Sequence, residues 1–280
     1  MNILLKVRDN PLFQLIQHRA TALTSSVLWM ILAASFLISL GLSVGLGLVL
    51  SGAAPQTIGL VFRVVTVIPA LLLTVAALGS GAVAAYLAAA MQATEEVQSM
   101  RLTALADADF VDGYRAGGVF RLRLIYVLAA GTLPLAYTSL LFTLLNPSAS
   151  SGQSGMVSLI SAGAVLLSLL GVALRFVADT ALWTALGTLF GLRFKNTGSA
   201  IAATLGIGAV VSAIIWAINS GLSTGLTSLI ISSFAISFDR ATTLLAAAQL
   251  ALGLFIIVQR VFFLLIAAAL ARLAARYVGT

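Results

Sequence analysis

Long apolar runs separated by short polar segments set the pattern of the chain. The six longest runs cover about 26–50, 57–90, 124–145, 156–189, 200–219 and 241–269. At 1.5 Å per helical residue, about 20 residues are enough to cross a hydrocarbon core of roughly 30 Å. Backbone groups in lipid must pair within the protein, and continuous apolar runs favour helices over barrel strands. The pattern predicts an all-α integral membrane protein with six transmembrane helices.

Two of the runs are longer than a bilayer requires. The run 57–90 is expected to tilt, to kink near Pro69 or to project into the cytoplasm. The apolar stretch 200–238 contains Asn219-Ser-Gly and Ser223-Thr-Gly, which are typical of turns. We therefore expect the fifth span to end near Asn219 and short outward-facing helical pieces to follow.

Composition excludes a soluble domain. Of the residues, 61% are apolar and 8% are charged, and the mean hydropathy is +1.13. A soluble domain carries about 25% charged residues, because its surface must be hydrated.

The segment 1–25 is amphipathic and precedes a transmembrane domain that covers 26–280. Pro11 suits the first turn of a helix, and Leu12, Leu15, Ile16 and Leu23 then fall near one side. This pattern predicts an interfacial amphipathic helix on the cytoplasmic leaflet, with a disordered polar lead-in as the alternative.

Basic residues predict the orientation, since those that flank spans are retained in the cytoplasm. With the N-terminus inside, the outer segments hold only Arg240, whereas the inner segments hold Lys6, Arg8, Arg19, Arg101, Arg115, Arg121, Arg123, Arg193, Lys195, Arg272 and Arg276. Both termini are therefore expected on the cytoplasmic side of the membrane. The net charge of +7 indicates attraction to anionic lipid and not to nucleic acid.

Residues for catalysis are not apparent. The chain has no cysteine and one histidine, His18, and it lacks nucleotide-binding, hydrolase and zinc motifs. We expect no enzyme activity and no cofactor-binding or metal site, so any use of ATP needs another chain.

Four charged residues lie inside the apolar runs: Arg63, Arg175, Asp179 and Arg260. Such residues are costly in lipid and often mark a functional path. Arg175 and Asp179 are four positions apart, so they share a helix face and can pair. Snorkelling or structural pairing is one interpretation, and a role in a substrate path or in gating is the other.

Glycines recur in three of the runs. A glycine lets two helix backbones approach closely in lipid. We expect such contacts at Gly41, Gly45, Gly47, Gly79, Gly81, Gly206 and Gly208.

The segment 91–123 is the one long polar segment between the spans, and a short helix is expected to begin near Asp107, where acidic residues suit the helix dipole. The segment reads Met-Arg-Leu-Thr-Ala-Leu-Ala-Asp-Ala-Asp-Phe-Val-Asp-Gly-Tyr over 100–114. It resembles the loop between spans 2 and 3 of ATP-binding-cassette (ABC) type-2 permeases, in which Leu-Thr-Pro-Leu-Ser precedes (Asp/Glu)-Ile-Val-x-Gly-Lys. Glu96 stands at the acidic position of that loop, and Asn10-Pro11 resembles the start of the family's elbow helix. The chain has Ala104 in place of the proline and Tyr114 in place of the lysine, and it lacks the Gly-Thr-Leu of the family.

The resemblance implies a permease subunit that pairs with a second permease, as a homodimer or heterodimer, and with cytoplasmic ATPase subunits. The loop would couple to the ATPase through Glu95, Glu96, Arg101, Thr103, Asp107, Asp109, Asp112, Tyr114 and Arg115, with Glu96, Asp109 and Tyr114 facing it. The departures from the motif favour an alternative, a permease-derived structural subunit packed among other membrane subunits of a larger complex, such as an energy-transducing assembly.

Overall fold

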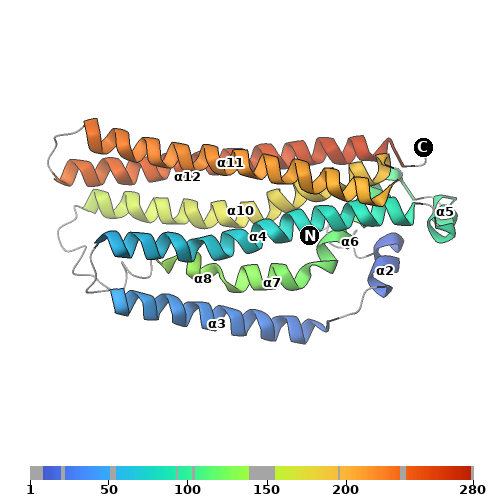
Figure 1. Ribbon diagram of the computed structural model, residues 1–280, viewed down its shortest axis with the longest axis horizontal. Helices are drawn as coiled ribbons and strands as arrows, with labels where there is room; N and C mark the ends of the chain where they lie inside the picture. The colour runs from blue at the N-terminus through green and yellow to red at the C-terminus, as the bar shows by residue number, and fades with distance from the viewer. Residues whose placement is uncertain are drawn as a thin grey trace.

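The computed structural model describes residues 9–19, 23–50, 55–92, 94–102, 105–138, 155–194, 196–233 and 238–278. All regular secondary structure in these ranges is helical, which confirms the predicted all-α class (Figure 1). The helices are α2 (Pro11–His18), α3 (Ser25–Val49), α4 (Pro55–Met91), α5 (Glu95–Arg101), α6 (Asp107–Arg121), α7 (Arg123–Gly131), α8 (Leu133–Ala136), α10 (Gly155–Arg193), α11 (Thr197–Ser233) and α12 (Phe238–Ala275).

Five helices among the described residues, α3, α4, α10, α11 and α12, are long and apolar enough to cross a membrane. They lie side by side along the length of the molecule (Figure 1). Their exposed side chains are largely apolar, as lipid-facing surfaces require. The chain is therefore a multi-pass membrane protein. The predicted runs 26–50, 57–90, 156–189 and 241–269 correspond to α3, α4, α10 and α12, and α4 continues as one helix past Pro69.

The predicted helix end near Asn219, with separate helical pieces after it, is wrong, although the apolar part suited to crossing a membrane, Thr197–Leu222, ends close to that residue. Helix α11 runs without interruption from Thr197 to Ser233. In apolar surroundings the backbone has no water to bond, so intrahelical hydrogen bonds persist through residues that favour turns in water. The side chain of Asn219 donates to Gln259 Oε1 of α12 at 3.4 Å instead of competing for the backbone.

The predicted third span, 124–145, is not one helix over its described part. It divides into α7 and α8 at Thr132, because Pro134 has no N–H to continue the ladder; residues 139–145 lie outside the described ranges. Helix α3 supplies hydroxyl donors to the carbonyl groups at the break. Ser39 donates to the Gly131 carbonyl at 2.6 Å, and Ser43 donates to the Pro134 carbonyl at 3.1 Å. These bonds hold α7 and α8 against α3.

Glycines bring α4 and α10 into backbone contact. A Cβ atom on Gly187 would overlap the Gly81 carbonyl oxygen, and one on Gly191 would overlap the Ala85 carbonyl oxygen. The predicted close contact is confirmed at Gly81, which meets the backbone of Trp183, and at Gly79 and Gly208, which each meet a leucine side chain of a neighbouring segment. Close contacts are not found at Gly41, Gly45 and Gly206, where a Cβ would meet no atom of the described residues within 4 Å. The glycine pattern alone does not show which helix face meets a neighbour.

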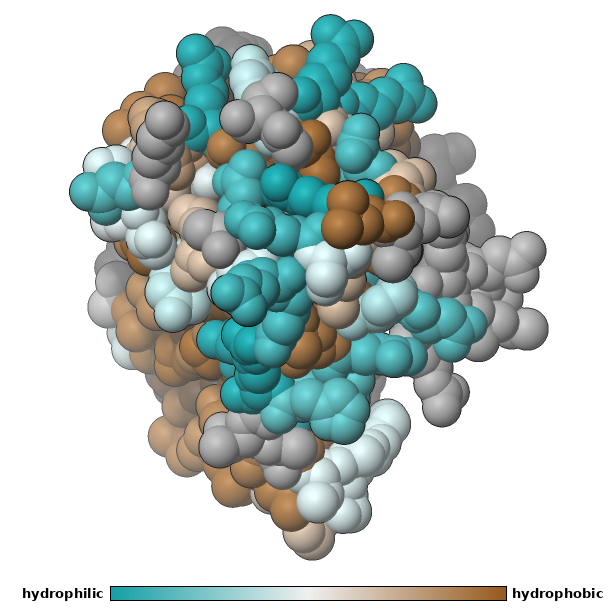
Figure 2. Space-filling view, turned by 90° about the vertical axis from the view of Figure 1, so that its right-hand side faces the viewer, coloured by the Kyte–Doolittle hydropathy of each residue, from teal (hydrophilic) through white to brown (hydrophobic). Residues whose placement is uncertain are grey.

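The polar elements gather at one end of the bundle. Figure 1 shows α2, α5 and the C-terminal end of α12 there. Seen from that end, much of the face is hydrophilic, and hydrophobic residues lie at its left and lower left (Figure 2). This end carries the predicted coupling segment.

Candidate functional site

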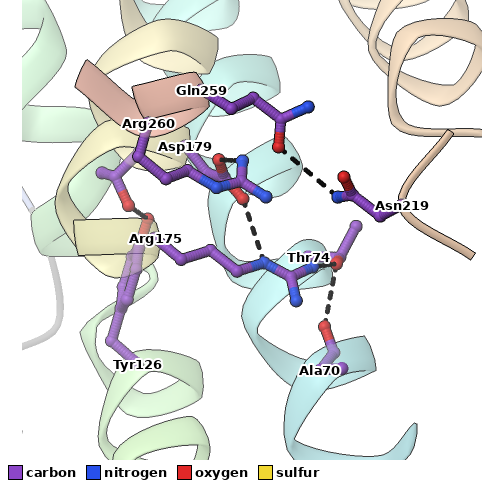
Figure 3. Close-up of polar contacts among 9 residues, drawn as sticks. Ala70, Thr74, Tyr126, Arg175, Asp179, Asn219, Gln259 and Arg260 are labelled. Carbon is purple, nitrogen blue, oxygen red and sulfur yellow. Dashed lines mark hydrogen bonds and ion pairs between the residues drawn. The ribbon is translucent and has the colours of Figure 1, made fainter. Parts of the chain in front are cut away.

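Helices α10 and α12 bring three charged side chains together inside the bundle (Figure 3). Arg175 Nε donates to Asp179 Oδ2 at 3.2 Å, so the predicted pair on α10 is confirmed. Arg260 of α12 forms an ion pair with the other carboxylate oxygen, Oδ1. One carboxylate thus serves two guanidinium groups. The sequence placed Arg260 in an apolar run but gave no signal that it meets Asp179, because 81 positions separate them.

Neighbouring side chains orient the two arginines. Arg175 Nη2 donates to Thr74 Oγ1 of α4 at 3.0 Å, and that hydroxyl donates to the Ala70 carbonyl at 2.8 Å. The guanidinium of Arg260 lies 5.1 Å from the centre of the Phe263 ring. These contacts hold both cations in place beside Asp179.

The charge of this cluster is not balanced. An arginine stays protonated in proteins, so two arginines and one carboxylate leave one positive charge. Arg260 is 4% exposed and Asp179 is 7% exposed, and an unbalanced buried charge is costly in a low dielectric. The arrangement therefore favours a further negative group nearby.

A cavity of about 480 Å³ adjoins the cluster between α4, α10, α11 and α12. Such a volume is within the range of about 300–1,000 Å³ that ligand pockets occupy. Arg175, Asp179, Arg260, Thr74 and Asn219 line it, together with the rings of Trp183, Trp216 and Phe263. Within the described part of the chain, Arg260 Nε and Asn219 Oδ1 are buried without a hydrogen-bond partner. Both residues line the cavity, and each has a polar atom that the described part of the chain leaves without a hydrogen bond.

The segment 91–123 folds as α5 and α6. Helix α6 begins at Asp107 as predicted, and Asp109 accepts the Ala106 N–H at 3.2 Å. The prediction that Tyr114 faces a partner is wrong. Its side chain packs with those of Phe110 and Val111 in the core and is 1% exposed. Its hydroxyl has no partner among the described residues, and burial raises the pKa of Tyr114 to about 12.

Arg115 and Asp112 also lie along α6, and they form an ion pair at 3.4 Å between Nη1 and Oδ1. Burial lowers the pKa of Arg115, and the carboxylate of Asp112 partly offsets that shift. Thr103 and the side chain of Arg63 lie outside the described residues.

The predicted amphipathic helix is present as α2, and α6 covers its apolar face. Leu12 and Ile16 are buried against Gly113 and Gly117 of α6. Asn10 caps α2 by accepting the Leu12 N–H at 3.0 Å, and it donates to the Asp109 carbonyl at 2.6 Å. Helices α2 and α6 therefore form one packed unit.

Helix α5 presents the exposed part of the predicted coupling segment. Leu102, which follows α5, is 90% exposed, and Glu95, Glu96 and Asp107 are exposed in the same segment. Glu96 also pairs with Arg19, just beyond α2. Arg101 is partly buried, and two of its guanidinium nitrogens have no partner in the described ranges. We call Glu95, Glu96, Leu102 and Asp107 the α5 surface.

Metal-binding geometry is not found among the described residues, where no three histidine, cysteine or acidic side chains gather as metal ligands would. No protein-family model, curated protein or solved structure matches this chain. The cavity beside Asp179 and the α5 surface are the two features on which a function can be argued.

Proposed function

We propose that the chain is the permease subunit of an ABC-type transporter in a bacterial cytoplasmic membrane. It spans that membrane six times with both termini inside, the broken segment α7–α8 belonging to the third passage. It pairs with a second permease chain, and separate cytoplasmic ATPase subunits power it.

The observation that carries this proposal is the cavity beside Asp179. A protein that only fills space in a membrane gains nothing from burying three charged side chains next to a cavity of about 480 Å³. Charged side chains inside apolar spans are typical of substrate paths. The cavity is walled by four helices, so relative movement of α4 and α11 against α10 and α12 would change access to it.

The α5 surface supports an ATPase as the partner. The exposed Leu102 and the exposed carboxylates elsewhere in the segment 95–107 suit a partner cleft that has an apolar floor and basic edges. Val97 of α5 is buried in one core cluster with Tyr114 of α6 and Leu87 of α4, so a push on α5 would reach the spanning helices through that cluster.

Co-purification tests the proposal. The tagged chain is isolated from its native membrane, and bound ATPase is identified by mass spectrometry and by ATP hydrolysis. We expect the wild type to retain an ATPase and Leu102→Asp with Glu95→Lys to lose it. Arg272→Glu changes an exposed charge on α12, outside α5 and α6, and serves as the control.

A second candidate is a structural subunit that has lost ATPase coupling. The burial of Phe110, Val111 and Tyr114 favours it, because these side chains of the coupling segment are used inside the chain itself. Recovery of a larger membrane complex without an ATPase, from wild type and variant alike, would refute the permease proposal.

A further inference from the structure

We propose that the cavity beside Asp179 binds the phosphate oxyanion of an amphipathic molecule, such as an anionic phospholipid. Arg175 and Arg260 hold the oxyanion, and the apolar part of the molecule leaves the cavity between α4 and α11. The cavity is the site on which the proposed function is based. Binding of this ligand does not depend on that function; only the claim that the ligand is transported rests on it.

The charges at the cavity select an anion. Arg175 and Arg260 together exceed the single carboxylate of Asp179 by one positive charge, and a phosphodiester carries one negative charge. Binding therefore neutralises the cluster. Guanidinium groups match phosphate oxygens in geometry, and charge-assisted hydrogen bonds are the strong ones.

Arg260 lines the cavity and has hydrogen-bonding capacity that the described part of the chain leaves unused. Arg260 is almost fully buried, and its Nε has no partner in the described part of the chain. Arg175 lines the same cavity, and its side chain bonds to Asp179 and Thr74 (Figure 3). The two arginines come from different helices, so an oxyanion between them also links α10 to α12.

The rim of the cavity points to an amphipathic ligand. Buried Asp179, Arg260 and Trp183 form its inner part, whereas Trp216 is 73% exposed and Leu71 is 57% exposed. Leu71 belongs to α4 and Trp216 to α11, so the opening lies between these two helices. An apolar opening on the lipid-facing side suits an acyl chain better than a small hydrated anion.

Tryptophan emission provides the assay. The chain has three tryptophans, and Trp183 and Trp216 line the cavity. The third, Trp29 on α3, is replaced by Phe so that the signal reports the cavity alone. The full-length Trp29→Phe protein in a neutral detergent is titrated with phosphatidylglycerol, with phosphatidylcholine and with glycerol phosphate.

We expect a saturable change in emission and a rise in melting temperature with phosphatidylglycerol only. Arg260→Gln and Arg175→Gln each leave one neutral Arg–Asp pair, so these variants should fold and bind on the order of tenfold more weakly. Asp179→Asn adds to the positive charge and should bind more tightly. Arg272→Gln removes an exposed charge from α12 and should bind as the parent does.

Equal responses to phosphatidylglycerol and phosphatidylcholine, or undiminished binding by both arginine variants, would overturn the proposal. A response to glycerol phosphate equal to that of the lipid would refute the amphipathic ligand. The loss of ATPase co-purification leaves these results unaffected, so failure of this inference and failure of the proposed function are distinguishable.

Discussion

Asp179 is the residue on which the charged cluster depends, because its two oxygens neutralise cations from two helices. Arg175 is 31% exposed at its side chain and reaches Thr74, whereas Arg260 is 5% exposed. Loss of the carboxylate therefore leaves the deeper cation, Arg260, in the more costly position.

We predict that Asp179→Asn lowers the stability of the purified protein by about 3 kcal/mol, the cost of breaking a buried ion pair. Adding Arg260→Gln should recover more of this loss than adding Arg175→Gln, since it removes the deeper charge. Melting in detergent measures both, with Asp107→Asn as the exposed control. Equal recovery by the two second-site changes would contradict the asymmetry between the arginines.

Tyr114 gives a prediction on pH. Its folded-state pKa of about 12 exceeds the ordinary value of 10.0, so the neutral form is favoured in the folded protein. The contribution of Tyr114 to the free energy of unfolding is fully present below pH 10. It is lost as the pH rises from 10 to 12, because the tyrosine hydroxyl ionises in the unfolded chain before it ionises in the folded protein.

This loss should be on the order of 2 to 3 kcal/mol and should be absent in Tyr114→Phe. At pH 7 the same variant should be more stable by about 1 kcal/mol, since it removes a buried hydroxyl without a partner among the described residues. Denaturation measured between pH 7 and 12 tests both. Parallel curves for the two proteins would show that Tyr114 is not the titrating group.

At the scale of elements, two kinds of contact hold neighbouring helices together. Helices α4 and α10 meet backbone to backbone through Gly81 and Gly187. Helix α3 instead holds the broken α7–α8 through the hydroxyl groups of Ser39 and Ser43. Both devices replace the hydrophobic effect, which does not drive helix association in lipid.

We predict that Gly187→Ala costs about 2 kcal/mol or more, because the added Cβ overlaps the Gly81 carbonyl and the helices must move apart. Gly206→Ala makes the same chemical change where no atom of the described residues lies within 4 Å, so it should be neutral or stabilise by up to about 1 kcal/mol. Thermal melting of the two variants side by side provides the measurement. A loss at Gly206 equal to that at Gly187 would refute the contact between α4 and α10.

At the scale of the whole molecule, the bundle has one end rich in polar elements and long apolar sides. The basic residues between spans are expected on the cytoplasmic side, and many of them belong to this end. The end with α5 and α6 is therefore expected inside the cell.

Single cysteines test this orientation, since the chain has none of its own. A cysteine at Ala108, exposed in the first turn of α6, should be protected in intact cells from a thiol reagent that cannot cross the membrane. A cysteine at Ser151 should be labelled from outside. Permeabilised cells, in which both should react, serve as the control; labelling of the Ala108 site in intact cells would reverse the topology.

The sequence by itself determined what depends on local pattern. Runs of apolar residues defined the five long helices, Asn10-Pro11 marked the start of α2, and Asp107 marked the start of α6. The pair Arg175–Asp179 was predictable because both residues lie on one helix at a fixed spacing.

Only the tertiary structure decided what depends on contacts between distant residues. Arg260 forms an ion pair with Asp179, 81 positions away, and Ser39 donates a hydrogen bond to the Gly131 carbonyl, 92 positions away. The side chain of Tyr114 on α6 is buried in the protein core. An apolar run indicates that a helix crosses the membrane. It does not indicate which face of that helix contacts another helix, because the lipid and the protein interior are both apolar. The cavity and its excess positive charge depend on which faces of α4, α10, α11 and α12 pack together.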